Sequence, residues 1–520
     1  MKKVVITIFI LLFTLTACDA GRIFTNPSGI PQGFTPQPTA YEHYDEYIAP
    51  QIPVTTTIVT TDADTTLRLS MRHPLTLNPL LNEDVTVARI LRLIYEPLII
   101  LDENLNPVSH LAELEFTTDF TSALIVLRPD SFWSDGTPVT MADLVFSVEA
   151  LRNAPQNAIY RNKVANIRHI RRISSRSAQI YFHHASVCVG VSLGFPIIPA
   201  HHFRNNMNAD PIGNGSFVFE YHSPMRSIRL TQNLSSFRPI AHFTDVEVIF
   251  LPDAQTELYA FDQGRIDAIY LPLTEWVRHH TVRHPGYEIF PAMYFEFIGF
   301  NFNSEFSNIN MRQGIAQVFD ACDAIGAVYL HHAQRATTPF HPAGIMAAEV
   351  EVLPHDPARA RALLYAEPLQ RPIIIIANDD NPQRVSTARR LAAELNAIGV
   401  HTRAEILPYG EYFARLEEGG FDIFVGGMTL NYPPDIQIFF SGGMFMDCEL
   451  LKEAYEQARQ LHFNEAQYLQ ALAEFQQTFT DRLPIISLAF RHSAVLTNQR
   501  IMQNVAPATG NVLGWVNEWR

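Results

Sequence analysis

The spacing of apolar residues predicts alternating strands and helices along most of the chain. Leu124 to Leu127 form a run of four apolar residues with the length and β-branched content of a buried strand. After an Asp135-Gly136-Thr137-Pro138 turn, Thr140 and Asp143 have the three-residue spacing of a capping box, which marks the start of a helix. The apolar face expected on this helix consists of Leu144, Val145, Val148 and Leu151.

A second region, from about residue 356 to residue 425, alternates helix and strand patterns. Asp356 and Asn381 each precede a proline and are expected to cap a helix, and Gly399 is expected to end the second of these helices. Apolar strands are expected at 373–377, 400–406 and 421–425. This order predicts a parallel sheet with right-handed crossovers. Two further elements are predicted later in the chain, one long helical stretch at 449–481 and a strand at 485–490.

Composition places the chain among ordinary globular proteins and narrows the choice of partners. The chain has 520 residues, 47% of them hydrophobic and 18% charged, which is enough for two or three sizeable cores. Its formal charge of −15 argues against a nucleic-acid partner, because such a partner requires a basic surface. Cys188, Cys322 and Cys448 show no C-x-x-C spacing, so we expect buried free thiols, while one bridge between an undetermined pair stays open.

The N-terminus has the form of a secretory signal. Lys2 and Lys3 precede the apolar run Val4–Phe13, which is too short to be a comfortable transmembrane span. Leu15-Thr16-Ala17-Cys18 resembles a bacterial lipobox, which implies a lipoprotein signal peptide at 1–17 and a lipid on Cys18; a plain secretory signal is the alternative. Residues 18–65 are rich in Pro, Thr and Gly, and we expect them to form a flexible tether.

The sequence contains two patterns that suggest catalysis or metal binding, and neither is complete. Gly190-Val191-Ser192-Leu193-Gly194 matches the nucleophile elbow of α/β-hydrolases, but Pro196 and Pro199 disfavour the helix that this elbow requires. A secreted serine hydrolase that uses Ser192 is therefore a disfavoured alternative. Adjacent histidines point to opposite faces of a strand and do not chelate, so we expect no metal site and no cofactor. The histidine doublets are His183-His184, His201-His202, His279-His280 and His331-His332.

The string from Trp133 to Asp143, WSDGTPVTMAD, resembles a family signature. It is similar to the signature of family 5 of the extracellular solute-binding proteins, the peptide- and nickel-binding receptors of ABC importers. Collinear segments resemble further motifs of that family: 74–81, 87–98, 107–113, 211–217, 264–268 and 308–316. The resemblance implies an α/β fold of the type II periplasmic-binding-protein-like class, with two lobes, a hinge and an extra domain. The implied division is 66–95, 196–292 and 483–520 for lobe I, 96–195 for its extra domain, and 293–482 for lobe II.

The resemblance also implies a ligand site between the lobes. The ligand-anchoring loop of the family is similar to residues 426–435, with Gly427, Met428, Thr429 and Asn431 as ligand-binding positions. In peptide-binding relatives the position of Asn431 is an aspartate that pairs with the α-ammonium of the peptide, whereas this chain has an amide. Three explanations stay open: Asp435 supplies the charge, the ligand lacks a free amine, or the alignment shifts across Pro433-Pro434. Register alone adds Val85, Tyr160, Tyr270 and Tyr294 as ligand contacts.

These features together predict a lipid-anchored, monomeric substrate-binding protein on the extracytoplasmic face of the cell membrane. It is expected to bind oligopeptides, to work with the permease subunits of an ABC importer, and to catalyse no reaction. Asn431 motivates an alternative with the same fold, a receptor for a non-peptide solute such as a nickel chelate, heme, an opine or a sugar.

Overall fold

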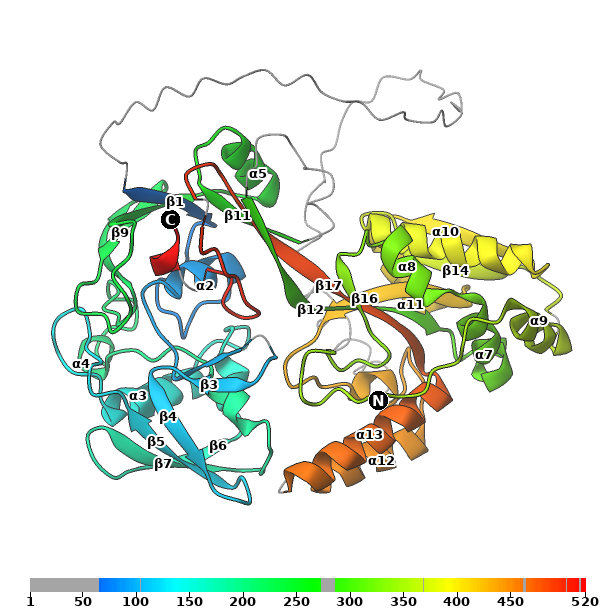
Figure 1. The fold of residues 1–520 in the computed structure, drawn as a ribbon, viewed down its shortest axis with the longest axis horizontal. Helices are drawn as coiled ribbons and strands as arrows, with labels where there is room; N and C mark the ends of the chain where they lie inside the picture. The colour runs from blue at the N-terminus through cyan, green and yellow to red at the C-terminus, as the bar shows by residue number, and fades with distance from the viewer. Residues whose placement is uncertain are drawn as a thin grey trace.

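The computed structural model describes residues 65–102, 104–272, 286–367, 369–461, 464–501, 503–513 and 516–520. The predicted signal peptide, Cys18, nearly all of the tether and the doublet His279-His280 lie outside these residues. Figure 1 shows two groups of elements, one with β1 to β11 and one with β13 to β16, which we call the first half and the second half. No helix in the described part of the chain has both the length and the apolar content needed to cross a bilayer.

Two four-stranded sheets form the first half. One has the order β1-β10-β9-β8, in which only β1 and β10 run parallel, and the other has the antiparallel order β4-β5-β7-β6. The strand bounds are β1 Thr66–Met71, β4 Ala112–Phe116, β5 Ser122–Leu127, β6 Ile167–Arg172, β7 Ser177–Phe182, β8 Phe217–Ser223, β9 Ser227–Gln232 and β10 Asp245–Phe250. A short hairpin adds β2 Ile99–Leu101 and β3 Pro107–Ser109.

Helix α3 (Met141–Arg152) begins where the sequence predicts, because Thr140 and Asp143 form the expected capping box. Its buried face contains Leu144, Val148 and Leu151 as predicted, but it lacks Val145 and also contains Met141, Asp143 and Ser147. Val145 is only half-buried, and Ser147 faces the interior instead, where its hydroxyl accepts a hydrogen bond from the Ile198 N–H at 2.9 Å. The other helices of the first half are α2 Val85–Leu91, α4 Ala200–Phe203 and α5 Ala254–Asp262, with 3-10 turns at Arg161–Val164, Val189–Leu193 and Val516–Glu518.

One mixed sheet, with the order β11-β17-β12-β16-β14-β15, extends across both halves. The pairs of β14 with β15 and with β16 are parallel, which confirms the parallel sheet predicted for this region. Its strands are β11 Ala268–Pro272, β12 Gly286–Phe300, β14 Ile373–Asn378, β15 Thr402–Leu407, β16 Ile423–Thr429 and β17 Ile485–Thr497, and β13 Ala333–Arg335 pairs with β17. The accompanying helices are α7 Ile309–Val318, α8 Ala321–Ala327, α9 Pro357–Ala366, α10 Pro382–Ala397 and α11 Tyr409–Glu418, with 3-10 turns at Glu305–Ser307 and Gln437–Phe439.

The prediction of one long helical stretch at 449–481 is wrong, because the chain breaks it into α12 (Glu449–Gln460) and α13 (Glu465–Arg482). Asn464 causes the new start, since its side chain accepts a hydrogen bond from the Gln467 N–H at 3.1 Å. Both helices bury aromatic side chains against the core of the second half, among them Tyr455, Phe475 and Phe479.

Strands β12 and β17 connect the two halves, as Figure 1 shows. They pair with each other from Gly286–Thr497 to Gly299–Ile485, while β17 also pairs with β11. The halves meet again at Leu105 and Cys188, two residues of the first half that are buried in the aromatic core of the second half. All three described cysteines are free, as expected, but only Cys188 is buried, and Cys322 is exposed because just Ala324 of α8 faces the core.

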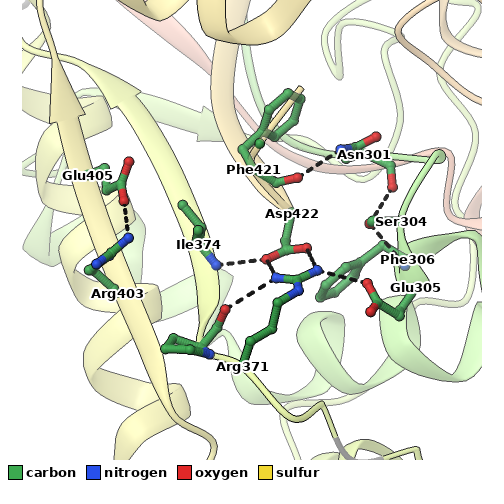
Figure 2. Close-up of polar contacts among 12 residues, drawn as sticks. Asn301, Ser304, Glu305, Phe306, Arg371, Ile374, Arg403, Glu405, Phe421 and Asp422 are labelled. Carbon is green, nitrogen blue, oxygen red and sulfur yellow. Dashed lines mark hydrogen bonds and ion pairs between the residues drawn. The ribbon is translucent and has the colours of Figure 1, made fainter. Parts of the chain in front are cut away.

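A buried carboxylate fixes one end of the parallel strands (Figure 2). Asp422, just before β16, is fully buried and accepts two hydrogen bonds from Arg371, at 2.6 and 2.7 Å. It also accepts one from the Ile374 N–H of β14 at 2.8 Å. Nearby, the Asn301 amide donates to the Phe421 carbonyl at 2.8 Å. These contacts hold the amino ends of β14 and β16 together.

Candidate ligand-binding site

The carboxyl ends of β14 and β16 form a polar edge beside the first turn of α10. Asn378 ends β14, Thr429 ends β16, and Asn381 caps α10 by accepting a hydrogen bond from the Arg384 N–H at 3.1 Å. Ligands of open α/β sheets bind outside the carboxyl ends of parallel strands, so this edge is the candidate site.

A buried ionic cluster lies against this edge. Glu296 of β12 has no exposed surface, and its Oε2 accepts a hydrogen bond from Arg384 Nε at 3.0 Å. Its Oε1 lies 3.2 Å from Nε of Arg491, a residue of β17. The side chains of Arg384 and Arg491 are 9% and 7% exposed, so one carboxylate and two guanidinium groups share a nearly dry space. This cluster carries one more positive than negative charge.

Arg384 joins the cluster to the strand ends. Its Nη2 donates to the Tyr294 hydroxyl at 2.7 Å and to the Gly427 carbonyl at 3.1 Å, and its Nη1 donates to Asn378 Oδ1 at 3.2 Å. Burial by itself lowers the pKa of Arg384, but the charge of Glu296, the hydrogen bond to Glu296 and the nearby tyrosines Tyr294 and Tyr412 together outweigh burial and raise that pKa above its ordinary value. Arg384 therefore stays charged while it fixes three separate elements.

The residues predicted in the second half come together at this edge. Tyr294 pairs with Thr429 across β12 and β16, and the Gly427 carbonyl lies beside Arg384. A Cβ on Gly427 would lie 2.5 Å from Glu296 Oε2, so the ionic cluster requires glycine at this position. Met428 is half-buried, whereas Thr429 and Asn431 are exposed.

The residues predicted in the first half are more dispersed. Val85 begins α2 and is 36% exposed, and Tyr160 packs on the core of the first half, where burial raises its pKa. Tyr270 lies under the Arg89 guanidinium, 3.9 Å away, and its hydroxyl lies 3.0 Å from Ser493 Oγ. Ser493 is two residues after Arg491 on β17, so Tyr270 and Tyr294 contact the same face of that strand.

Glu296, Arg384, Arg491 and Asn378 are site residues that the sequence reasoning missed. One signal was present, because Glu296 interrupts the aromatic and apolar run of β12. A charged side chain in such a run is almost never fully buried unless an oppositely charged partner is buried with it. The partners lie 88 positions away on α10 and on the distant strand β17, where no local pattern indicates them.

Two other chemical hypotheses can be compared with the geometry. Ser192 lies in a 3-10 turn and donates its hydroxyl to the Val189 carbonyl at 2.6 Å, so it is not held on the sharp strand-to-helix turn of a nucleophile elbow. His183 and His184 are exposed, with ring centroids 6.4 Å apart. No group of three or more His, Cys, Asp or Glu side chains suited to a metal occurs in the described ranges.

The two joined α/β halves, the long connecting strands and the polar edge at the carboxyl ends define a type II periplasmic-binding-protein-like fold, as predicted. The family model for bacterial extracellular solute-binding proteins, family 5 (middle part), matches residues 106–442. The chain belongs to this family, whose members bind solutes and are not enzymes, which removes the hydrolase alternative.

Known relatives and solved structures agree with this assignment. A probable di/tripeptide-binding protein 5 of Pseudomonas aeruginosa is 26% identical over 238 residues, which is 44% of this chain and 45% of that protein. The match therefore spans less than half of the relative. The ABC transporter substrate-binding protein CtaP from Listeria monocytogenes superposes with a TM-score of 0.73 at 16% identity, covering 87% of this chain and 98% of CtaP. NikZ from Campylobacter jejuni, in complex with Ni(L-His), superposes with a TM-score of 0.65 at 20% identity, covering 88% and 99% of the two chains.

Proposed function

We propose that this protein binds oligopeptides and delivers them to an ABC importer. The observation that carries the proposal is the exposed end of β16, where Thr429 pairs with Tyr294 beside the polar cluster, and the exposed Asn431 follows two residues later. An extended peptide can align its main chain with such a strand end, while nearby side chains select among ligands. The names of the Pseudomonas relatives, which are di/tripeptide-binding proteins, support peptides as the ligand class.

In this proposal the protein is a monomer held on the extracytoplasmic face of the membrane. Residues 1–17 are removed, Cys18 carries the lipid, and residues 18–65 link the lipid to the folded body. The lipobox resemblance and the extracellular location of the family support this arrangement. Lobe II corresponds to residues 293–482, and its limits lie within β12 and at the end of α13, just before β17; β12 and β17 are the strands that link the halves. The rest of the folded body is lobe I, with 96–195 as its extra domain.

Asn431 favours a second candidate, a receptor for a solute without a free amine. Its exposed amide carries no charge that could neutralise an ammonium group, and Asp435 nearby is also exposed. A nickel chelate, heme, an opine or a sugar would need no carboxylate at this position.

Mass spectrometry of ligands that co-purify with a Cys18→Ser, leaderless protein separates these candidates. A tightly bound ligand dissociates slowly, so it should stay bound through gentle purification. We expect a series of peptide masses after denaturation. A single non-peptide mass, together with no thermal stabilisation by a mixed peptide pool, would contradict the peptide proposal.

A further inference from the structure

The chain separates its charges along the sequence. Residues 150–209 contain no Asp or Glu, but they contain eight Lys and Arg residues. Because the whole chain carries −15, the rest of the chain carries −23. An asymmetry of this kind is typical of a protein whose basic part faces an anionic partner. The eight residues are Arg152, Arg161, Lys163, Arg168, Arg171, Arg172, Arg176 and Arg204.

Three of these arginines lie on β6, which is the edge strand of the sheet β4-β5-β7-β6. Arg168, Arg171 and Arg172 are all exposed, and none of them forms an ion pair with another residue that the structure describes. Arg152 of α3 is also exposed, and it donates hydrogen bonds to the carbonyls of Ile167 and Arg168. These four arginines form one group on the surface, which we call the basic patch.

The acidic residues of this sheet lie away from the basic patch. Glu113 and Glu115 are on β4, and β4 is the third strand from β6, at a separation of about 14 Å. Exposed charges are largely screened beyond about 8 Å at physiological ionic strength. Asp119 lies in the turn between β4 and β5, at the end of the sheet away from Arg172. These three carboxylates therefore neutralise little of the charge of the patch.

The exposed acidic residues around α3 also leave the basic patch positive. Asp130 accepts hydrogen bonds from Arg128 at 3.0 Å, and Asp135 is hydrogen-bonded to His201 at 2.7 Å. Glu149 is exposed on α3, three positions before the arginine of the patch, so it offsets one of the four positive charges. Four arginines and one glutamate give this surface a net charge of +3.

The turn from β6 to β7 places an apolar side chain beside the basic patch. Ile173 directly follows Arg172 and is 55% exposed, and Arg176 ends the same turn. The Ser175 carbonyl accepts a hydrogen bond from the Met141 N–H at 2.8 Å, which fixes this turn against the start of α3. An exposed apolar side chain flanked by cations is typical of segments that bind at the interface of a membrane.

We propose that the basic patch and Ile173 hold the folded body against an anionic phospholipid surface. Arginine binds the phosphate oxygens of lipid headgroups with paired hydrogen bonds, and Ile173 can enter the boundary between headgroups and acyl chains. The rest of the chain, at −23, is repelled by the same surface, so the charges favour this one orientation. A protein strand is a less suitable occupant, because Arg152 already bonds two carbonyls of β6. The inference goes beyond the proposed function, since it concerns the membrane and not the solute.

The length of chain before the described residues allows this contact. β1, where the folded body begins, lies at the opposite end of the first half from β6 (Figure 1). Cys18, the proposed lipid site, precedes Thr65 by 47 positions, and a chain of that length spans at most about 160 Å. The proposed anchor can therefore hold this face near the membrane, where even weak contacts are occupied.

The test measures how the Cys18→Ser, leaderless protein co-sediments with phospholipid vesicles. This protein carries no lipid, so its binding must come from the folded body. One set of vesicles contains only phosphatidylcholine, which is neutral overall, and a second set also contains the anionic phosphatidylglycerol. Each arginine near an anionic surface increases the partition coefficient about fivefold, so the charge of the patch predicts roughly 100-fold tighter binding to the second set. This preference should weaken as the salt concentration rises.

Two variants with the same change of charge connect the preference to the patch. The first combines Arg168→Gln, Arg171→Gln and Arg172→Gln; it should fold, because all three side chains are exposed, and it should lose most of the roughly 100-fold preference. The control combines Arg359→Gln, Arg361→Gln and Arg389→Gln, three exposed arginines of α9 and α10, and should keep that preference. Should the first variant fail to fold, Arg171→Gln alone provides the measurement, with about a fivefold loss expected.

Soluble polyglutamate and the Ile173→Ser variant separate a lipid surface from an acidic protein. On a lipid surface, Ile173→Ser should weaken vesicle binding about fivefold, because an apolar contact is lost. Binding to polyglutamate without binding to anionic vesicles would overturn the proposal and identify an acidic protein as the partner. No preference for anionic vesicles, or a preference that the first variant keeps, also overturns it. None of these residues belongs to the candidate ligand-binding site, so either result leaves the proposed solute binding untouched.

Discussion

Replacing Glu296 with Gln tests whether the buried ionic cluster depends on a single carboxylate. The substitution keeps the size of the side chain but removes the charge that faces Arg384 at 3.0 Å and Arg491 at 3.2 Å. Two guanidinium groups that are 9% and 7% exposed would then lie close together without compensation. Neither can reach solvent well enough to recover its hydration, so we expect a large loss of stability.

The expected magnitude follows from the burial of the pair. Removing one partner of a buried ion pair costs roughly 3–5 kcal/mol. If the second half unfolds as one cooperative unit of about 200 residues, this loss lowers its Tm by about 10 °C. Thermal unfolding followed by circular dichroism measures this change. The matched control is Glu305→Gln, because Glu305 is 50% exposed, pairs with Arg371 at the opposite edge, and should cost less than about 1 kcal/mol.

A second substitution identifies the cause of the loss. If repulsion between the two arginines is responsible, Glu296→Gln combined with Arg491→Gln should recover part of the lost Tm. A Glu296→Gln protein within about 1 kcal/mol of the wild type would refute the idea that this carboxylate compensates both arginines.

Three further predictions concern other parts of the fold. Asp422→Asn keeps an acceptor for the Ile374 N–H but loses the charge facing Arg371, which is 43% exposed, so urea unfolding should show a loss of only about 1–2 kcal/mol. Burial, and then the charge of His492, lower the pKa of His341 from 6.5 to about 4. Between pH 4 and 6.5 the unfolded chain therefore binds more protons than the folded chain, and the free energy of unfolding should fall with decreasing pH by at most about 1.4 kcal/mol per pH unit. If the pH dependence of the free energy of unfolding is the same in His341→Asn as in the wild type, this assignment is contradicted. Burial, and then the charge of Glu465, raise the pKa of the Cys188 thiol to about 12, so a thiol reagent should modify the exposed Cys322 before Cys188. Because Cys448 is half-buried, the check uses a protein with both Cys322→Ser and Cys448→Ser, in which fast labelling would contradict this order.

Local sequence patterns predicted those elements whose signals are contained within a few residues. The Thr140–Asp143 box starts α3, and the Asn381-Pro382 pair starts α10, because capping needs only the neighbouring backbone. The parallel order of β14, β15 and β16 follows from the alternation of strands and helices. Asn464 is also a local signal, and overlooking it merged α12 and α13 into one helix.

The candidate site could be predicted only in part. The end of β16 and the loop after it were predicted from their resemblance to a family motif, and this resemblance identified Thr429 and Asn431. Glu296, Arg384 and Arg491 lie on β12, α10 and β17, and long-range folding alone brings them together. Pairings of this kind depend on strand register and helix docking, which no local spacing contains.

The late position of β17 in the chain affects when the protein can fold. This strand lies between β11 and β12 in the sheet and also pairs with β13, although all three are synthesised long before it. Until residues 485–497 emerge, β11 and one side of β12 lack their neighbour, and such unpaired strand edges slow folding and favour aggregation. A chain that completes its sheet last remains unfolded for longer during synthesis, and an unfolded chain is the form that a secretory channel can pass.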